Sequence, residues 1–283
     1  MHWQTARHRI DLSRPRVMGI VNVTPDSFSD GGRFASTRLA LEHAQRLVAD
    51  GADILDIGGE STRPGSPPVP LDEERARVIP VLREAVALGV PVSIDTSKPA
   101  LMREALDLGV DIVNDIWALR QAGAREAVAA HPSCGVCLMH MHGEPRTMQL
   151  DTMQGDAVPQ VLDFLRRQAQ AVQALGVARE RIVWDMGIGF GKTVAQNFAL
   201  LARQRELLQD GHPLLAGWSR KGSLGQVTGL PVGERLASSV AAAVIAIDHG
   251  ASIVRVHDVR ETVAAAKVWC AMREQRQTTG ESA

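Results

Sequence analysis

The chain has 283 residues, 45% of them hydrophobic, and 31 lysines and arginines balance 32 aspartates and glutamates. This length and composition allow a full core without disulfides or metal, and the formal net charge of -1 argues against general affinity for nucleic acids or anionic membranes. Three cysteines cannot form a closed disulfide set, residues 1–16 lack the apolar core of a signal peptide, and no apolar run reaches the length of a membrane span. We therefore expect a cytoplasmic protein.

Eight apolar runs typical of strands alternate with eight stretches of helical spacing along the chain. The expected strands are Val17–Val23, Ile54–Gly59, Val90–Thr96, Asp111–Ile116, Gly135–Met141, Arg181–Asp185, Pro213–Ser219 and Ser252–His257. The expected helices are Ser36–Asp50, Leu71–Leu88, Lys98–Leu108, Gly123–Ala130, Val158–Leu175, Gln196–Gln209, Val232–His249 and Val259–Glu274. Most of the strands are apolar throughout, as strands covered on both faces should be.

Eight strand–helix units predict an α/β fold, a closed (β/α)8 TIM barrel forming a single domain over residues 1–274, with a polar, frayed tail at 275–283. A doubly wound open sheet is the alternative. In either fold the ligand belongs at the carboxyl ends of the strands. Long loops at Thr24–Gly32 and Glu60–Pro70 follow the first two strands, and loops of this length are more often functional than idle.

Polar side chains stand where several expected strands end. Asp95, Asn114 and Asp185 each close an apolar run, and Lys221 follows the seventh strand. Two carboxylates, an amide and an ammonium group around the barrel mouth can form hydrogen bonds with a flat heterocycle that has donors and acceptors on its edge. The alternative for Asp95 is that it caps the helix that follows.

The last strand carries Arg255 and His257, which are two residues apart and so point to the same face. An arginine inside an apolar strand is costly unless something anionic meets it. This pattern favours an oxyanion or phosphate site, with a structural ion pair to a neighbouring strand as the alternative. Asn22, at the end of the first strand, could bind a Mg²⁺ ion that bridges to phosphate oxygens.

Three alternating glycines, Gly187, Gly189 and Gly191, follow Asp185 and suit a ligand pressed against the main chain. Two nucleotide motifs fail here, because a P-loop needs glycine at position 186, which is methionine, and a dinucleotide fingerprint needs glycine at position 192, which is lysine.

A zinc site is a further alternative, since Cys134 and Cys137 form a C-x-x-C with His140 and His142 close behind. Strand alternation turns Cys137 to the opposite face from His140. A buried thiol and satisfied core histidines are therefore the favoured interpretation.

Two long motifs resemble the signature regions of bacterial dihydropteroate synthases: VMGIVNVTPDSFSDGG at Val17–Gly32 and GADILDIGGESTRPG at Gly51–Gly65. Six shorter motifs of that family follow in order, and the resemblance spans about residues 17 to 270. They are SIDTSKP at Ser93–Pro99, NDI at Asn114–Ile116, CLMHM at Cys137–Met141, GFGK at Gly189–Lys192, SRK at Ser219–Lys221 and RVHDV at Arg255–Val259.

The resemblance implies a transferase that joins p-aminobenzoate to 6-hydroxymethyl-7,8-dihydropterin diphosphate in folate biosynthesis and is a sulfonamide target. It implies that Asp95, Asn114, Asp185 and Lys221 hold the pterin; that Asn22 with Mg²⁺, Thr62, Arg255 and His257 hold the diphosphate; and that Arg63, Pro64, Phe190, Ser219 and Arg220 form the aminobenzoate side. Asp95, Lys221, Arg255 and His257 are the expected catalytic residues. The family also tends to form homodimers.

The chemistry expected from this likeness is departure of diphosphate followed by attack of the amine on a stabilised pterin cation. Met186, Ile188 and Gly222 depart from the usual family pattern, and we expect all three to border the substrate sites. Apolar residues of the expected helix Val232–His249, namely Ala237, Ala241, Ala242, Val244 and Ile245, suit either a dimer interface or the core.

Two rival functions remain at this point. A corrinoid methyltransferase of the methyltetrahydrofolate type would share the pterin residues but would not need Arg63, Arg255 or His257. A non-catalytic pterin- or phosphate-binding protein is disfavoured by the intact polar set from Asn22 to His257.

Overall fold

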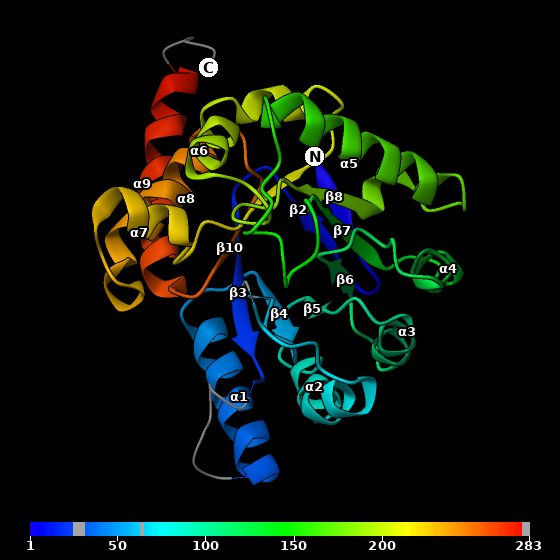
Figure 1. Ribbon diagram of the computed structural model, residues 1–283. Helices are drawn as coiled ribbons and strands as arrows, with labels where there is room; N and C mark the ends of the chain where they lie inside the picture. Colours follow the sequence, from blue (N-terminus) through cyan, green and yellow to red (C-terminus); the bar gives the residue numbers. More distant parts are fainter. Residues whose placement is uncertain (25–31, 63–64, 279–283) are drawn as a thin grey trace.

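The computed structural model describes residues 1–24, 32–62 and 65–278. Within them, parallel strands close into a barrel in the order β10-β3-β4-β5-β6-β7-β8-β9, and helices surround it (Figure 1). The barrel strands are β3 Arg16–Asn22, β4 Ile54–Gly58, β5 Val92–Asp95, β6 Ile112–Asp115, β7 Gly135–Met139, β8 Ile182–Asp185, β9 Leu214–Ala216 and β10 Ile253–Val256. The TIM barrel prediction is confirmed, and the open-sheet alternative is wrong, because β10 pairs with both β3 and β9.

The helices are α1 Gly32–Ala49, α2 Leu71–Ala85, α3 Pro99–Asp107, α4 Ala124–Ala130, α5 Ala157–Gln173, α6 Val194–Ala202, α7 Gly222–Thr228, α8 Leu236–Asp248 and α9 Val259–Thr278. They lie where the sequence placed them, but α6 ends at Ala202 rather than Gln209 and α8 begins at Leu236 rather than Val232, because short 3-10 helices occupy Gln204–Leu208 and Val232–Glu234. Three further differences concern α1, α7 and α9. Helix α1 begins at the last residue of the expected first loop. Helix α7 was not predicted, because two glycines in seven residues give it little intrinsic helix propensity. Helix α9 continues past Glu274, where the sequence suggested a frayed tail.

The core has two layers, one outside the barrel and one inside it. Side chains on the outer faces of the strands, such as Val254 and Val256, pack with the helices in one large cluster. A smaller cluster fills the barrel interior and includes Met18, Ile54 and Ile253. The alternation of strand faces assumed for the last strand is therefore correct.

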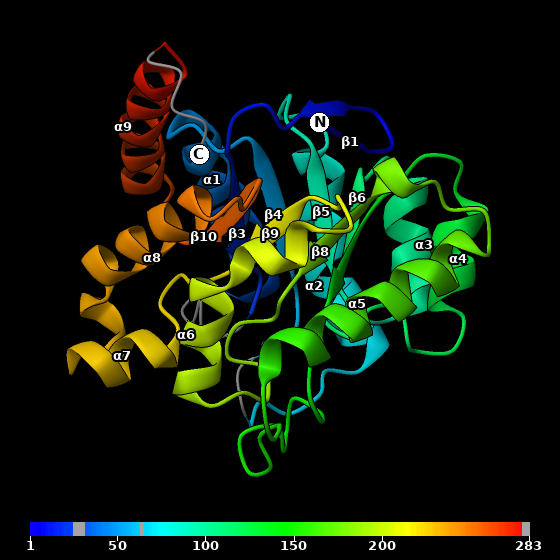
Figure 2. The ribbon, with the colours of Figure 1, turned by 90° about the horizontal axis from the view of Figure 1, so that it is seen from above.

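A short hairpin closes the amino-terminal end of the barrel. Strands β1 His2–Gln4 and β2 Arg9–Asp11 pair antiparallel and contribute Trp3 and Ile10 to the interior cluster, together with Leu12, which directly follows β2. In Figure 2 this hairpin lies at one end of the barrel. The sequence interpretation missed it, because two strands of three residues give no clear periodicity.

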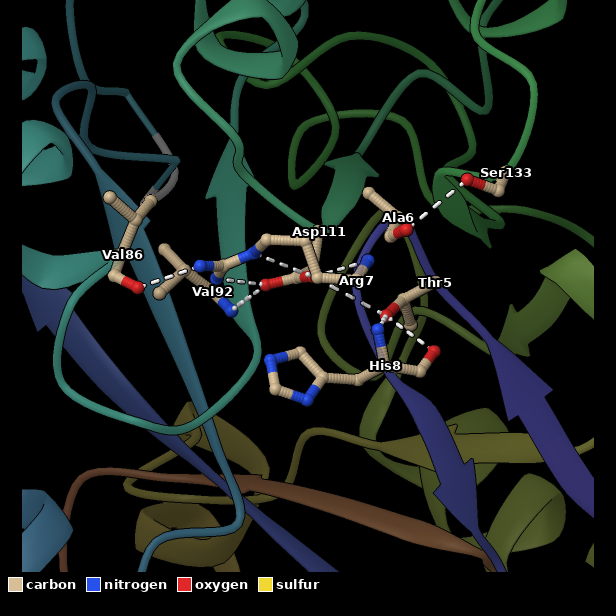
Figure 3. Close-up of polar contacts among 8 residues, drawn as sticks. All are labelled: Thr5, Ala6, Arg7, His8, Val86, Val92, Asp111 and Ser133. Carbon is tan, nitrogen blue, oxygen red and sulfur yellow. Dashed lines mark hydrogen bonds and ion pairs between the residues drawn. The ribbon is translucent and has the colours of Figure 1, made fainter.

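A buried carboxylate, Asp111, holds the turn of this hairpin in place (Figure 3). It accepts hydrogen bonds from the backbone nitrogen of Arg7 at 2.9 Å, from Arg7 Nη2 at 2.6 Å and from the backbone nitrogen of Val92 at 3.0 Å. Arg7 also reaches the carbonyl of Val86, 2.7 Å away, and Ser133 donates to the carbonyl of Ala6. Because this end is sealed by protein, a ligand must enter at the carboxyl ends of the strands.

None of the helices described is both long enough and apolar enough to cross a bilayer.

Candidate functional site

On the inner face of the barrel, several strands change from an apolar side chain to a polar one between two successive inward-facing residues. Ile54, Ile112, Val183 and Ile253 belong to the interior apolar cluster. Two residues further along the same strands, on the same face, stand Asp56, Asn114, Asp185 and Arg255. The apolar layer forms the floor of a polar site at the carboxyl ends of the strands.

A cavity of about 910 Å³ opens above this floor. Its lining includes every described residue predicted for the substrate sites: Asn22, Thr62, Asp95, Asn114, Asp185, Phe190, Ser219, Arg220, Lys221, Arg255 and His257. Arg63 and Pro64, and all of the first loop between Thr24 and Gly32, lie outside the described residues. The convergence of distant strand ends at one rim, on which the sequence interpretation depended, is therefore what the structure has.

Arg255 is the centre of a buried ionic network. Its Nε lies 2.5 Å from Asp56 Oδ2, and its Nη2 lies 2.7 Å from Asp95 Oδ2. Burial disfavours the charged guanidinium, but the two carboxylates outweigh this effect and raise the pKa of Arg255. Burial also raises the pKa of Asp95 to about 7, against the opposing effect of Arg255. The ion pair left open as an alternative for Arg255 is thus present, and the same arginine lines the cavity.

Asp95 does not cap helix α3, although the sequence left that role open. The residue at the start of the helix is Lys98, and no side chain caps it. The Asp95 carboxylate turns instead into the barrel and meets Arg255.

Sequence reasoning missed Asp56, which is fully buried and does not line the cavity. Its Oδ2 accepts hydrogen bonds from Arg255 Nε and, at 3.1 Å, from Asn114 Nδ2. The signal was available, because Asp56 is a carboxylate at an inward-facing position of an apolar strand. The argument applied to Arg255 would have selected it too.

Ser219 and His257 connect the segments that follow β9 and β10. Ser219 Oγ lies 2.9 Å from His257 Nδ1 and accepts a hydrogen bond of 3.1 Å from the backbone nitrogen of His257. Arg220 has a left-handed backbone with φ 58°, and its guanidinium pairs with Asp258 at 2.5 Å. In this state Arg220 lines the cavity with its charge already matched by a carboxylate.

The glycine run after β8 allows two main-chain segments to pack closely. A Cβ added at Gly187 would lie 1.9 Å from the carbonyl oxygen of His140, and one at Gly191 would lie 2.3 Å from that of His142. Both glycines have positive φ angles, 65° and 68°. The backbone nitrogen of Gly187 also donates to Asp185 Oδ1 at 2.7 Å, which holds that carboxylate at the cavity.

Lys192 stabilises this same turn, a role that the sequence analysis did not assign to it. Its buried Nζ donates to the carbonyls of Gly187 at 2.8 Å, Phe190 at 3.2 Å and His140 at 3.3 Å. Each of the three ammonium protons therefore has an acceptor. One acceptor, the carbonyl of His140, follows β7, and the other two belong to the glycine run.

One wall of the cavity is apolar and carries a cation. Met139, Met141, Met148 and Phe190 form a small cluster. Lys221 Nζ lies 4.4 Å from the centroid of the Phe190 ring, within cation–π distance. Burial lowers the pKa of Lys221 to about 8. This wall suits the face of a flat aromatic ring.

The four residues considered for zinc do not come together. Cys134 belongs to the outer core, whereas Cys137 belongs to the barrel interior. Burial lowers the pKa of His140 to about 2, which keeps its ring neutral. Among the residues described, no group of three or more histidines, cysteines, aspartates or glutamates is placed to hold a metal ion. A metal at Asn22 would therefore depend on oxygens from the substrate.

The three departures from the family pattern differ in position. Ile188 and Gly222 line the cavity, as expected. Met186 does not, and it is fully buried in the outer core instead. The expectation that it borders a substrate site was wrong, because Asp185 faces the barrel interior and strand alternation turns the next side chain outward.

The sequence matches the pterin binding enzyme family over residues 18–257. It is 49% identical to a dihydropteroate synthase of Neisseria meningitidis over 276 residues, which covers 95% of this chain and 97% of the relative. This chain belongs to the dihydropteroate synthase family of pterin binding enzymes.

Solved structures of dihydropteroate synthases agree with this membership. The Burkholderia cenocepacia enzyme, in complex with 7,8-dihydropteroate, is 50% identical, with a TM-score of 0.89 and 98% of each chain covered. The Xanthomonas albilineans enzyme with 4-aminobenzoic acid is 46% identical, with a TM-score of 0.91, covering 96% of this chain and 99% of that one. The family resemblance inferred from the motifs is confirmed.

Proposed function

We propose that this chain catalyses the dihydropteroate synthase reaction, joining p-aminobenzoate to 6-hydroxymethyl-7,8-dihydropterin diphosphate and releasing diphosphate and 7,8-dihydropteroate. The observation that carries the proposal is a single cavity that combines an anion-binding pair, Arg255 and His257, with the ring-binding set Asp95, Asn114, Asp185 and Lys221. Related enzymes bind 7,8-dihydropteroate and 4-aminobenzoic acid, one the product and the other a substrate of this reaction.

The pterin ring lies, in this proposal, against the floor of the cavity. Asp185 is fixed by the backbone nitrogen of Gly187 and accepts hydrogen bonds from ring nitrogens. Asn114 supplies an amide edge, and Lys221 donates to an acceptor on the ring. The apolar wall formed by Met139 and its neighbours covers one face of the heterocycle.

The diphosphate is held, in this proposal, by Arg255, His257, Thr62 and Asn22. Asn22 contributes a neutral amide oxygen, which by itself is a weak site for a cation. Because Mg²⁺ is commonly bound through one or two protein ligands together with substrate phosphates, this donor set fits the ion when the diphosphate is present. Bound Mg²⁺ would neutralise charge on the leaving group.

The aminobenzoate is placed beside Phe190 and Ser219, with its carboxylate near Ser219 and Arg220 and with Arg63 and Pro64 on the same side. Arg220 is paired with Asp258 at present, so that carboxylate would have to share its guanidinium. Phe190 and Lys221 stack at this edge and leave an aromatic face for the second ring.

The chemistry then needs no nucleophile from the protein. The bond between the exocyclic carbon and the diphosphate oxygen breaks, and the bonding electrons leave with the diphosphate, whose charge Arg255 and His257 stabilise. The positive charge spreads into the dihydropterin ring near Asp95 and Asp185. The amine nitrogen attacks the carbon, and the proton that it then loses passes to solvent water. A stable pterin adduct on the protein, detected by mass spectrometry, would contradict this route.

The direct test mixes the protein with the pterin diphosphate, p-aminobenzoate and Mg²⁺ and measures dihydropteroate and diphosphate. Equal amounts of both products are expected, with none when either substrate is omitted. Asp185→Asn tests the role of the charge, because it keeps the shape of the side chain and removes only its charge. We expect this variant to lower kcat/KM by about 100-fold. Binding of pterin without product would favour a non-catalytic protein. Methyl transfer in a separate mixture of the protein with methyltetrahydrofolate and a corrinoid would favour the other rival.

We further propose that the chain works as a cytoplasmic homodimer. The support is exposed apolar side chains on α8 and α9: Ile245 is 44% exposed, Val268 72% and Met272 38%. Of the residues named for an interface in the sequence, Ala237, Ala241 and Ile245 are exposed, whereas Ala242 is buried in the core. The cysteines are free, in keeping with a reducing compartment.

A further inference from the structure

The carboxylate of Asp56 lies below the substrate cavity and touches both halves of the proposed pterin diphosphate site. It is 0% exposed, and its Oδ2 accepts from Arg255 Nε at 2.5 Å and from Asn114 Nδ2 at 3.1 Å. Arg255 belongs to the diphosphate half and Asn114 to the pterin half. A single oxygen atom therefore connects strands β4, β6 and β10.

The charge of this carboxylate fixes the orientation of the Asn114 amide. Asp56 forms an ion pair with the Arg255 guanidinium through Oδ2, so this oxygen is an acceptor. The group of Asn114 that faces it must therefore be the NH₂. This leaves the Asn114 carbonyl oxygen and the second N–H for a ligand in the cavity.

The same contact fixes the plane of the Arg255 guanidinium. Its Nε is bound to Asp56 and its Nη2 to Asp95, which are on neighbouring strands β4 and β5. Two carboxylates at two edges of a planar group prevent its rotation. Within the residues described, Nη1 makes no hydrogen bond, so its two N–H groups and the second N–H of Nη2 are left to donate to an anion.

We propose that Asp56 is a positioning residue that couples recognition of the pterin ring to recognition of the diphosphate. It touches neither part of the substrate. Acting through Asn114 and Arg255, it orients an amide for the ring and a guanidinium for the leaving group, so that each half of the substrate meets a preorganised partner. The inference rests on the proposed function for the identity of the two ligands.

A neighbouring residue supplies a matched control. Ser93 is the register partner of Asp56 on β5, is also 0% exposed, and its Oγ has no hydrogen bond among the described residues. Ser93 contacts neither Asn114 nor Arg255 through a hydrogen bond. Ser93→Ala therefore disturbs the same buried layer without disturbing the coupling.

The test measures binding of the two halves separately by calorimetry, using 6-hydroxymethylpterin for the ring and inorganic pyrophosphate with Mg²⁺ for the anion. Asp56→Asn keeps the shape and removes the charge. We expect both affinities to fall by about tenfold or more, the size expected when a charge-assisted hydrogen bond is lost, and Ser93→Ala to leave both within twofold. A folded Asp56→Asn protein with both affinities within twofold of the parent would overturn the proposal.

A double variant separates positioning from a general effect on structure. In an Asn114→Ala background, Asp56→Asn should weaken pterin binding no further, because its effect on the ring acts through Asn114. It should still weaken pyrophosphate binding through Arg255. Additive losses for the pterin would contradict the proposed route.

A second single variant, Asn114→Asp, tests the same proposal if Asp56→Asn does not fold. Asn114→Asp leaves Asp56 in place but sets a carboxylate against it, and we expect it to weaken pyrophosphate binding although Asn114 is not a diphosphate ligand. Unchanged pyrophosphate binding would overturn the coupling. These measurements need no turnover, so a parent that binds both ligands but forms no dihydropteroate would refute the proposed function and still test Asp56.

Discussion

Individual side chains at the strand ends differ in protonation because they differ in burial and in neighbours. Burial raises the pKa of Asp95 to about 7, and burial lowers the pKa of Lys221 to about 8. Both values fall near neutral pH, where a small change in environment alters charge. Perturbed groups of this kind are typical of catalytic sites.

We expect kcat/KM to show a bell-shaped dependence on pH. Asp95 acts as a carboxylate, so activity should fall as the pH drops through about 7. Lys221 acts as a donor in its charged form, so activity should also fall as the pH rises through about 8. Initial rates across this range test the prediction. Lys221→Arg should remove the alkaline limb, because arginine stays protonated, and an unchanged alkaline limb in that variant would assign it to another group.

Gly222, the first residue of α7, offers a test of helix order beside the cavity. A Cβ there would meet no atom within 4 Å, and its φ angle is not positive, so a side chain fits. We expect Gly222→Ser to stabilise the fold by about 0.4 to 1 kcal/mol by restricting the unfolded chain. Urea unfolding measures this effect. If the glycine loosens the start of the helix, KM for aminobenzoate and the sulfonamide inhibition constant should also change, and the idea fails if both stay the same.

At the scale of elements, the turn after β8 depends on glycines that allow close contact between main chains. The Lys192 ammonium donates to the carbonyls of Gly187 and Phe190 in this turn, and the backbone nitrogen of Gly187 donates to Asp185. The loop at residues 142–155 packs on the same turn, with Gln149 Nε2 donating to the carbonyl of Gly189 at 2.7 Å. Site geometry here is set by backbone contacts.

Gly191→Ala should destabilise the protein by about 2 to 4 kcal/mol, because the new Cβ would lie 2.3 Å from the carbonyl oxygen of His142 at a positive φ angle. Gly176→Ala is the matched control. That residue also has a positive φ, 90°, but no atom lies within 4 Å of the added Cβ, so only the conformational cost of about 1 to 2 kcal/mol applies. Equal losses in chemical denaturation would show that the close contact contributes nothing.

The amino-terminal hairpin stabilises the barrel far from the chemistry. Trp3 is fully buried in the interior cluster, and its Nε1 donates to the carbonyl of Arg181 at 2.9 Å. We expect Trp3→Ala to lower the free energy of unfolding by about 3 to 5 kcal/mol while KM values stay unchanged at temperatures where the variant is folded. Trp3→Phe, which keeps an aromatic ring, should lose less. A large change in KM without loss of stability would mean that the hairpin acts on the site.

At the scale of the whole molecule, one end of the barrel is sealed and the other carries the cavity, so the exposed apolar side chains of α8 and α9 are left for another role. Ile245→Glu would replace one of these apolar side chains with a charge, and we expect it to convert a dimer to a monomer in light scattering. Leu175→Glu is the control, since Leu175 is similarly exposed, 46% against 44%, but follows α5. A parent protein that is already monomeric would refute the homodimer.

The sequence by itself determined the architecture and most of the site. Strand runs, helix spacing and glycine stops are local patterns, so eight units and a barrel could be predicted from them. Asp95, Asn114, Asp185 and Arg255 could be selected because a polar residue that closes or interrupts an apolar strand stands out in one dimension.

Only the tertiary structure decided which of these groups touch. That Arg255 reaches Asp56 and Asp95, and that Asp56 also holds Asn114, follows from strand register and closure, which connect residues as far apart as 56 and 255. The hairpin and α7 were missed for a related reason: their local propensity is weak, and packing against the barrel supplies the stability that their sequences lack.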